Sequence, residues 1–474
     1  MPANYHGFLA NSTACSINGA PYSERNFENF VVVDHHGGRP VTRLGKWGHE
    51  CLRRLAVPAL AASVLSFALL FPLAGASAFS GIIIDAKTGK PIVGALVALG
   101  GNSVRTDAAG AFAVDGNTKV MRIRAYGYLR TQRVIRVSRS KPLEIQLRSF
   151  VPRAIFASLS TFTDRGQRDK LFGLFKTTSI NALVVDVKGE DGTLLWNGPS
   201  LTPQVGVAER RVGTKTIARI LRRLHDAGIY VIARIVVFKD DVLVAHHPEM
   251  ALRGNDGSLL QEKDGYSWTD PRIKSLRDYN AAIAVRAARL GFDEIQFDYI
   301  RFPVTRTPPR DCAADCSQMR RAAVRGFLAE ARARLTKYNV FISADVFGYT
   351  SWDPGDTNVG QKLEDIAAEV DYICPMLYPS SFRNGIPASP MPLDKPGKIV
   401  ELSLRHAQLR TGLAAVRFRP WLQAFADFNF DHREFGRLEI GLQTAAADRF
   451  GSDGWMLWHR HSTYVAADLP AHDQ

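Results

Sequence analysis

The chain has 474 residues, more than one ordinary domain holds, so we expect two or three domains. Its content of 46% apolar and 22% charged residues excludes a disordered chain. The net charge of +14 is uneven, with +8 on residues 79–150 and only +4 on residues 151–474. Because the long second part also has no basic-aromatic strip, this distribution disfavours a nucleic-acid binder.

Residues 1–51 form a polar leader, rich in His, Gly and Asn, without helical or strand periodicity. We expect this leader to be disordered, or to reflect a start assigned too early, with the true start near Val41 or Leu44. A signal sequence is normally N-terminal, which favours the later start.

Residues 52–78 have the composition of a signal peptide. Arg53 and Arg54 precede a long apolar run, and the small residues "ASA" end it, which predicts cleavage after Ala78. The alternative is an uncleaved signal anchor, because the run from residue 55 to 79 is nearly long enough to span a bilayer. The first interpretation predicts a periplasmic or secreted protein, and the second a single-pass membrane-anchored one; both predict export.

Residues 79–150 contain short strand-like segments separated by turn signals, which predicts a small all-β sandwich. The segment resembles carboxypeptidase regulatory-like (transthyretin-like) domains. The residues that carry the resemblance are Gly81, Asp85, Thr88, Gly89, Pro91, Gly94, Ala95, Thr106, Asp107, Gly110, Phe112, Ala125, Gly127 and Tyr128. The resemblance implies a non-catalytic spacer or stabilising module. Its +8 charge is either an ordinary solvated face or a means of attraction to an acidic cell-surface polymer.

From residue 151 to 474, apolar strand-like runs alternate with helix-like stretches. The eight runs are "RAIFASLS", "NALVVDVKG", "IYVIARIVVF", "FDEIQFDYI", "VFISADVFG", "DYICPMLYP", "RFRPWLQAF" and "GWMLWHR". Eight strands with intervening helices over roughly 310 residues predict an α/β fold, a (β/α)₈ TIM barrel. An open doubly wound sheet is the alternative, but no glycine-rich phosphate loop follows the first strand.

The stretch "GFDEIQFDYIRFP" places polar residues on one face of a buried strand. In a barrel, alternate strand residues point inward and functional groups lie at the C-terminal ends of the strands. Gln296 and Asp298 are therefore expected inside, and Ile295 and Phe297 against the helices. The same parity places inside, or at the strand end, Asp186, Lys188, Arg234, Ser343, Asp345, Met376, Tyr378, Gln423, Trp458 and then His459.

Three of these residues, Asp186, Asp298 and Asp345, are carboxylates that would meet at one mouth. Burying several charges is costly unless they are paired or perform chemistry. Paired carboxylates beside aromatic side chains are typical of glycoside hydrolysis. Asp298 and Asp345 end neighbouring strands, the fourth and fifth, and strands lie ~4.8 Å apart. This spacing favours the ~5–5.5 Å carboxyl separation of retaining enzymes.

The segments "YVIARIVVFKD", "SWTDP", "GFDEIQFDYIRFP", "SADVFGYTSW", "DYICPMLYPS", "RPWLQAF" and "GWMLWHR" resemble a bacterial family of barrel-fold glycoside hydrolases, distantly similar to α-amylase-type barrels. The resemblance implies that Asp298 takes the nucleophile position and Asp345 the acid/base position. Because those barrels keep Glu where this chain has Asp345, Asp186 or Glu190 are alternative acids. The implied substrate-binding residues are Lys188, Arg234, Gln296, Tyr299, Arg301, Trp352, Tyr378, Gln423, Trp458 and His459.

We therefore expect an exported glycoside hydrolase acting on a cell-surface or environmental polysaccharide. The alternative is a barrel that binds glycan without cleaving it, which would follow if no second carboxyl group lay within ~10 Å of Asp298. No cofactor is implied. A metal site is disfavoured, because neither His459 and His461 nor Cys312 and Cys316 have a complementary ligand pair. The two cysteines could instead close a short disulfide, and Cys374 is expected to be buried.

Overall fold

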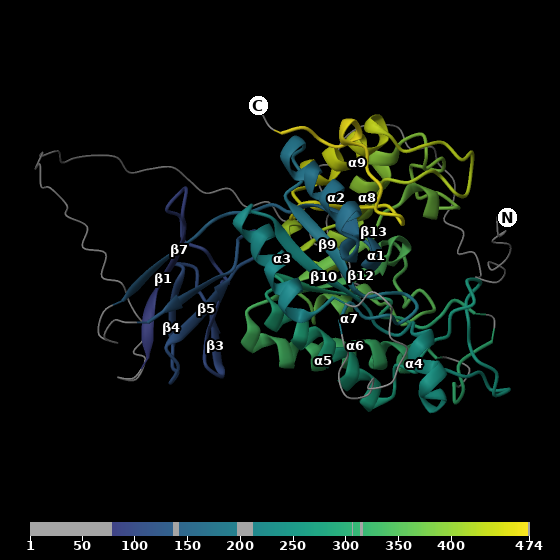
Figure 1. Cartoon of the computed structure of the whole chain (residues 1–474), viewed down its shortest axis with the longest axis horizontal. Coiled ribbons are helices and arrows are strands. Elements are labelled where there is room, and N and C mark those ends of the chain that lie inside the picture. The colour runs from purple at the N-terminus through teal and green to yellow at the C-terminus, as the bar shows by residue number, and fades with distance from the viewer. Residues whose placement is uncertain (1–77, 136–141, 197–211, 306, 313–315, 473–474) are drawn as a thin grey trace, which may run out of the picture. The chain divides into compact units, whose positions relative to one another are not determined.

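The computed structural model describes residues 78–135, 142–196, 212–305, 307–312 and 316–472 (Figure 1). The predicted leader and all but the last residue of the predicted signal segment lie outside these residues, so both remain predictions. Within the described ranges, no helix has the length and apolar content needed to span a membrane.

The first described domain consists of two small β-sheets, as expected for a sandwich. One sheet has the order β4 (Ala111–Val114), β1 (Phe79–Asp85), β7 (Leu143–Leu147), and the other β3 (Asn102–Arg105), β2 (Leu96–Leu99), β5 (Val120–Arg124), β6 (Thr131–Val134). Ile83, Phe112 and Ile145 from the first sheet share one core with Val97 and Ile123 from the second. This core joins the two sheets into a single unit.

The second domain is a closed barrel of eight parallel strands, which confirms the predicted fold class. Its strands in chain order are β8 (Arg153–Ala157), β9 (Ala182–Lys188), β10 (Tyr230–Val236), β11 (Glu294–Asp298), β12 (Phe341–Phe347), β13 (Tyr372–Met376), β14 (Trp421–Gln423) and β15 (Trp455–Trp458). The last strand pairs with the first, so the sheet has no free edge.

Helices surround the strands (Figure 1). They are α1 (Leu159–Thr163), α2 (Arg165–Thr177), α3 (Thr214–Asp226), α4 (Asp241–His246), α5 (Lys274–Leu290), α6 (Ser317–Leu335), α7 (Leu363–Ala367), α8 (Pro396–Thr411) and α9 (Arg437–Phe450), with short 3₁₀ turns η1 (Pro248–Met250), η2 (Thr336–Tyr338), η3 (Gly348–Ser351), η4 (Pro379–Ser381), η5 (Ala415–Arg417) and η6 (Ala466–Asp468). Helices α5, α8 and α9 each stop at a left-handed glycine, as Gly291 does after α5 (φ 113°).

The side chains of the strands alternate as the sequence predicts. Ile295 and Phe297 of β11 belong to the outer core beneath the helices. Between them, Gln296 points into the barrel, where its amide nitrogen donates to the sulfur atoms of Met456 at 3.3 Å and the buried Cys374 at 3.5 Å. The barrel interior is thus a packed core, and only its ends can hold a ligand.

The N-terminal end of the barrel is closed by charged and aromatic contacts. Glu294 at the start of β11 accepts a hydrogen bond from Arg419 at 2.6 Å. Tyr126 and Phe150, from the first domain and the linker after it, pack against the inner core cluster, and Arg130 donates to Asp293 at 3.0 Å. The C-terminal end is therefore the end where a site can be open.

The two cysteines at 312 and 316 form a disulfide, with their Cα atoms 5.4 Å apart. It lies just before α6 and outside the barrel interior. With a spacing of four residues, the disulfide closes only a short local loop, as the sequence suggested.

Candidate active site

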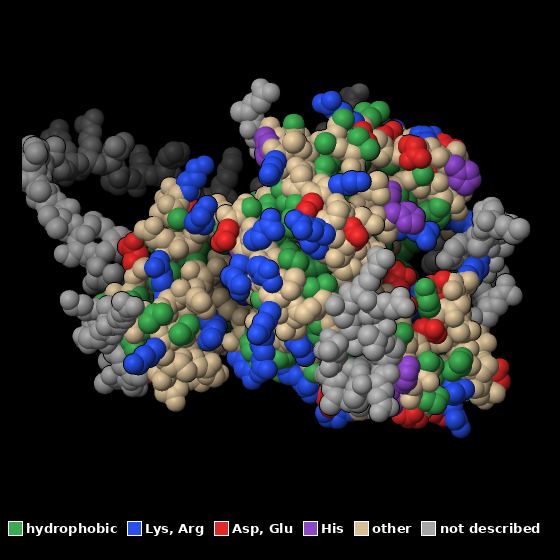
Figure 2. Space-filling model, in the orientation of Figure 1, with side chains coloured by type: hydrophobic (Ala, Val, Ile, Leu, Met, Phe, Trp, Pro, Cys, Tyr) green, Lys and Arg blue, Asp and Glu red, His purple; other side chains and the backbone are tan. Residues whose placement is uncertain are grey.

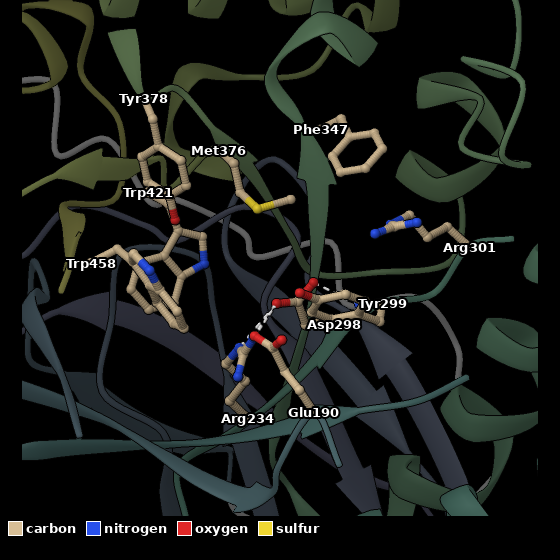
Figure 3. Close-up of a pocket in the computed structure, with 10 residues that line it drawn as sticks. All are labelled: Glu190, Arg234, Asp298, Tyr299, Arg301, Phe347, Met376, Tyr378, Trp421 and Trp458. Atoms are coloured by element: carbon tan, nitrogen blue, oxygen red, sulfur yellow. Dashed lines mark hydrogen bonds and ion pairs between the residues drawn. The ribbon is translucent and has the colours of Figure 1, made fainter. Parts of the chain in front are cut away.

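A pocket of about 190 Å³ opens at the C-terminal end of the barrel (Figure 3). It carries two carboxylates and two guanidinium groups, and the rest of its wall is aromatic apart from one methionine. The lining residues are Glu190, Arg234, Asp298, Tyr299, Arg301, Phe347, Met376, Tyr378, Trp421 and Trp458. The volume is below the ~300–1,000 Å³ of pockets for drug-sized ligands, which favours a small group such as one sugar ring.

Arg234 on β10 organises the floor of the pocket. Its Nε and Nη2 donate to one oxygen of Asp298, at 3.0 and 2.5 Å, and its Nη1 donates to Asp186 at 2.6 Å. Its Nε also lies 3.9 Å from Asp345. Burial lowers the pKa of Arg234, but the charges of Asp186 and Asp298 outweigh burial and raise it well above the ordinary value. A permanent cation is therefore held between three carboxyl groups.

Asp298 is the last residue of β11 and reaches the pocket itself. Besides its bonds to Arg234, it accepts the backbone N–H of Tyr299 at 2.6 Å. Tyr299 has φ of 50°, a left-handed conformation that side-chain-bearing residues rarely adopt and that tends to mark functional sites. The turn places the carboxylate and the following aromatic ring on the same pocket wall (Figure 3).

Asp345 and Asp186 are buried beside Arg234 and do not line the pocket. Asp345 is fully buried; one oxygen accepts from the indole N–H of Trp421 at 2.9 Å, and the other has no hydrogen-bond partner among the described residues. Burial, followed by the charge of Asp298, raises the pKa of Asp345 well above its usual range. Burial also raises the pKa of Asp186, to about 7, although Arg234 opposes the rise. Both groups favour the protonated form more than an ordinary aspartate.

The carboxyl groups are close enough for paired chemistry. The Oδ2 atoms of Asp298 and Asp345 lie 3.0 and 3.9 Å from the same nitrogen of Arg234. Those two oxygen atoms are therefore no more than about 7 Å apart, inside the ~10 Å limit for paired-carboxylate hydrolysis.

Glu190 is the second carboxylate that lines the pocket. It follows β9, and its side chain is 36% exposed, whereas the side chain of Asp298 is 7% exposed. It accepts a hydrogen bond from Lys239 at 3.1 Å, and Lys239 also pairs with Asp264. Glu190 thus lies at the solvent side of the pocket and is paired with Lys239. Asp298 lies at the base of the pocket and is paired with Arg234.

Arg301 forms part of the opposite wall. Its guanidinium donates to Glu262 at 2.6 and 3.2 Å. It also lies 4.6 Å from the ring centroids of both Trp268 and Phe347, and 5.0 Å from that of Tyr299. Because its charge is paired and its faces are covered, Arg301 is a rigid part of the wall.

Residues 154–464 match the family model described as "Putative glycosyl hydrolase domain", which is more than half of the chain. The chain belongs to this family. A comparison of the chain with curated proteins found no match.

Solved structures similar to this family member include a hypothetical protein from Ruminiclostridium thermocellum, at 31% identity and TM-score 0.35, with 40% of this chain and 97% of that chain covered. The PgaB (BpsB) glycoside hydrolase domain from Bordetella bronchiseptica is 15% identical, with TM-score 0.48 and coverage of 66% and 95%. A chitinase from Chromobacterium violaceum is 13% identical, with TM-score 0.40 and coverage of 66% and 96%. At these TM-scores, the assignment rests on the family match. The first domain lies outside that match, and its resemblance to carboxypeptidase regulatory-like domains stays a prediction.

Lys188 does not point into the barrel of this glycosyl hydrolase domain, contrary to the parity prediction. The register between β9 and β10 shifts after Asp186, so that Lys188 faces outward. Its ammonium group pairs with Asp240 at 2.7 Å and donates to Asn280 of α5 at 3.1 Å. It is fully buried, away from the pocket.

Two more expected substrate contacts lie elsewhere. Gln296 is inward, as predicted, but sits in the closed middle of the barrel and does not line the pocket. Trp352 stacks on His406 of α8, with ring centroids 4.5 Å apart, and its indole donates to Ser403. Trp352 thus packs in the helical layer, because the η3 turn after β12 directs it there.

Gln423 and His459 also lie outside the pocket lining. Gln423 is fully buried, and its amide nitrogen donates to Ser380 Oγ at 2.7 Å, which holds the η4 turn. His459 is close to His461, with ring centroids 6.0 Å apart; burial first, and then the charge of His461, lower its pKa. Across the described ranges, no three His, Cys, Asp or Glu side chains are grouped to hold a metal ion.

The sequence did not lead us to two residues that line the pocket, although both have the inward-facing parity of their strands. Trp421 has the same parity as Gln423 on β14, and Phe347 the same parity as Asp345 on β12. Extending the alternation to both ends of each strand would have identified both rings.

Proposed function

We propose that the barrel hydrolyses glycosidic bonds, with Asp298 as the charged nucleophile or base and Glu190 as the proton donor. The observation that carries this proposal is a pocket of suitable size with two carboxylates in unlike surroundings. Asp298 is fixed at the base by Arg234, and a negative charge there can attack or stabilise an oxocarbenium-like centre.

Glu190 is the better candidate for the acid than Asp345. A general acid must reach the leaving oxygen within hydrogen-bond distance. Glu190 lines the pocket and is partly exposed, whereas Asp345 is fully buried behind the indole of Trp421. In this assignment Asp345 forms part of the floor, where burial raises its pKa well above the usual range.

The aromatic wall supports a carbohydrate as the substrate. Trp458 stacks against Phe156, with ring centroids 4.1 Å apart, and this packing fixes its orientation in the pocket. Tyr378 and Trp421 complete the same side (Figure 3). Flat rings in fixed positions can cover the apolar face of a sugar, while the carboxylates bind its hydroxyl groups.

The test of this proposal is hydrolysis by residues 79–474 of glycosides that differ in their leaving group. Glu190→Gln should lower kcat/KM by roughly 10²–10⁴-fold for a poor leaving group, because such a group needs the proton. With a dinitrophenyl or fluoride leaving group the loss should stay below about tenfold.

Asp264→Asn is the matched control, because Asp264 shares Lys239 with Glu190 but does not line the pocket. It should change neither rate by more than a few-fold. Equal losses on both leaving groups, or the same losses in the control, would refute the acid role of Glu190. A glycan-binding barrel without activity predicts binding and no turnover of any glycoside.

We further propose that the protein is exported and that the basic first domain attracts an acidic cell-surface polysaccharide. Figure 2 shows Lys and Arg side chains over this domain, and the whole segment carries +8. Lys119 and Arg133 are exposed there. Because exposed charges are screened over ~10 Å at 0.1 M salt, binding through them should weaken with salt.

The double variant Lys119→Glu/Arg133→Glu should lower co-sedimentation with an insoluble anionic polysaccharide about tenfold at low salt, and much less at high salt. Lys170→Glu/Lys176→Glu, on the exposed side of α2, makes the same change of charge in the barrel domain. If both double variants lost the same affinity, the attraction would come from overall charge and not from the first domain.

A further inference from the structure

A row of aromatic rings leads out of the pocket along the loop between β14 and α9. Tyr378 lines the pocket, and its ring contacts that of Phe425 edge-on, with centroids 5.4 Å apart. Phe425 in turn stacks nearly parallel on Phe428, at 6.2 Å with an angle of 14° between the rings. The row therefore continues from the pocket wall to the surface.

The outer rings are exposed although they are large and apolar. Phe428 is 53% exposed and Phe430 is 37% exposed. Exposed apolar groups that adjoin a polar-rimmed pocket are typical of a binding surface. The nearby charges are paired with each other, since Arg433 donates to Asp431 at 2.8 Å. The shelf, defined here as Phe425, Phe428 and Phe430, is therefore apolar, and the charge of Arg433 beside it in the sequence is paired.

The loop that presents the shelf is fixed by a buried carboxylate. Asp427 is 2% exposed, and its Oδ2 accepts the backbone N–H of Phe430 at 2.7 Å, of Asp431 at 2.9 Å and of His432 at 3.1 Å. Its Oδ1 accepts the hydroxyl of Ser380 at 2.6 Å.

Gln423 anchors this arrangement to the barrel. Ser380, which donates to Asp427, accepts from the side chain of Gln423 at 2.7 Å, and Gln423 is the last residue of β14. Five hydrogen bonds to the Asp427 carboxylate thus fix the loop. Pre-organisation of this kind lowers the entropic cost of binding, which favours a surface that holds a ligand over one that is merely solvated.

We propose that the shelf is a subsite for the sugar units that follow the one in the pocket, so that the protein acts on chains rather than on single sugars. This inference rests on the proposed carbohydrate substrate and specifies its class as a neutral stretch of oligo- or polysaccharide. The ligand is a sugar chain because the row of rings is continuous with the pocket. A chain with one unit against Tyr378 places its next units over Phe425 and Phe428.

The test measures binding by calorimetry in the Asp298→Asn background, where turnover is blocked. The probes are chito-, cello- and malto-oligosaccharides of one to six units. Phe428→Ser should weaken binding of chains of three or more units by about tenfold, the scale of losing one stacked ring, and leave the single sugar unchanged. Asp427→Asn, which frees the loop but keeps the rings, should weaken the same chains.

Leu438→Ser is the matched control, because Leu438 is 68% exposed at the start of α9 and does not line the pocket. It should leave every affinity unchanged. Equal loss for single sugars and chains in Phe428→Ser, or a parent protein that binds no chain better than a single sugar, would overturn the subsite.

Failure of the subsite and failure of the proposed hydrolysis are distinguishable. If binding of oligosaccharide chains depends on Phe428 but the wild-type protein cleaves no glycoside, the subsite is supported and the proposed hydrolysis is refuted. If a single-sugar glycoside is cleaved and Phe428→Ser affects no chain, the hydrolase stands and the subsite does not.

Discussion

Asp298→Asn is expected to lower kcat/KM by about 10⁴-fold or more, the scale of removing a nucleophile. The change keeps the volume of the side chain and removes the charge, and only the charged form can attack or stabilise the reacting carbon. Binding of oligosaccharide should persist, because the aromatic wall is untouched. Activity on the best glycoside and affinity by calorimetry are the two measurements.

The comparison variant is Asp345→Asn, on the neighbouring strand. Asp345 does not reach the pocket and favours its neutral form, so a neutral amide there should cost far less activity than at position 298. Near-wild-type turnover by Asp298→Asn would remove Asp298 from the mechanism. A greater loss for Asp345→Asn would favour the acid/base role that the family resemblance implies for Asp345.

A second variant tests whether Asp298 faces the reacting carbon. Asp298→Gly creates space beside that carbon, and azide can enter it. Azide should then restore turnover and give a glycosyl azide of opposite anomeric configuration to the substrate, whether Asp298 is a nucleophile or a base that activates water. The wild-type product separates the two roles, because its anomeric configuration is retained with a nucleophile and inverted with a base.

The barrel and the inward direction of most site residues could be predicted, because both follow from a period of two along regular strands. Asp298, Arg234 and Tyr378 lie in the pocket for this reason. The depth of a residue could not be predicted in the same way. Asp298 and Asp345 follow directly after the paired residues Phe297 and Ala344, yet only Asp298 lines the pocket, because the indole of Trp421 lies on Asp345.

The remaining differences come from features without a local sequence signal. A register shift between β9 and β10 reverses the direction of Lys188, and only the pairing of the two strands shows it. Trp352 leaves the strand in a 3₁₀ turn, and its position is set by α8, which is fifty residues away in the sequence. Glu190 lies in a loop after β9, where periodicity gives no direction at all.

Arg234→Met should both destabilise the barrel and abolish efficient turnover. Removing one partner from a buried ion pair costs about 3–5 kcal/mol, because the remaining charges stay buried without compensation. Here the change leaves Asp186 and Asp298 without the cation that donates to both. Thermal unfolding and the pH dependence of kcat/KM report the two effects separately.

The sign of the pH effect follows from the buried acids. Since the pKa of folded Asp186 is about 7, above its ordinary value of 3.8, the protein binds extra protons when folded. The stability that Asp186 contributes to the folded protein is fully present below about pH 4 and is lost as the pH rises towards 7. Without Arg234, which lowers the pKa of both Asp186 and Asp345, these pKa values rise further. The destabilisation by Arg234→Met should therefore be larger at pH 8 than at pH 5.

Arg419→Met provides a matched control at the other end of the barrel. Arg419 is equally buried and also bridges two carboxylates, Glu294 and Asp453, each at 2.6 Å. Both variants should lower the melting temperature, but only Arg234→Met should move the acidic limb of the pH–rate profile upward, because Arg234 lowers the pKa of Asp186 and Asp345 beside the site. If Arg419→Met moved that limb equally, the shift would reflect general loosening of the barrel. If Arg234→Met melted normally and kept the wild-type profile, Arg234 would have neither a structural nor an electrostatic role, and the assignment of Asp298 as a carboxylate held by a cation would fail with it.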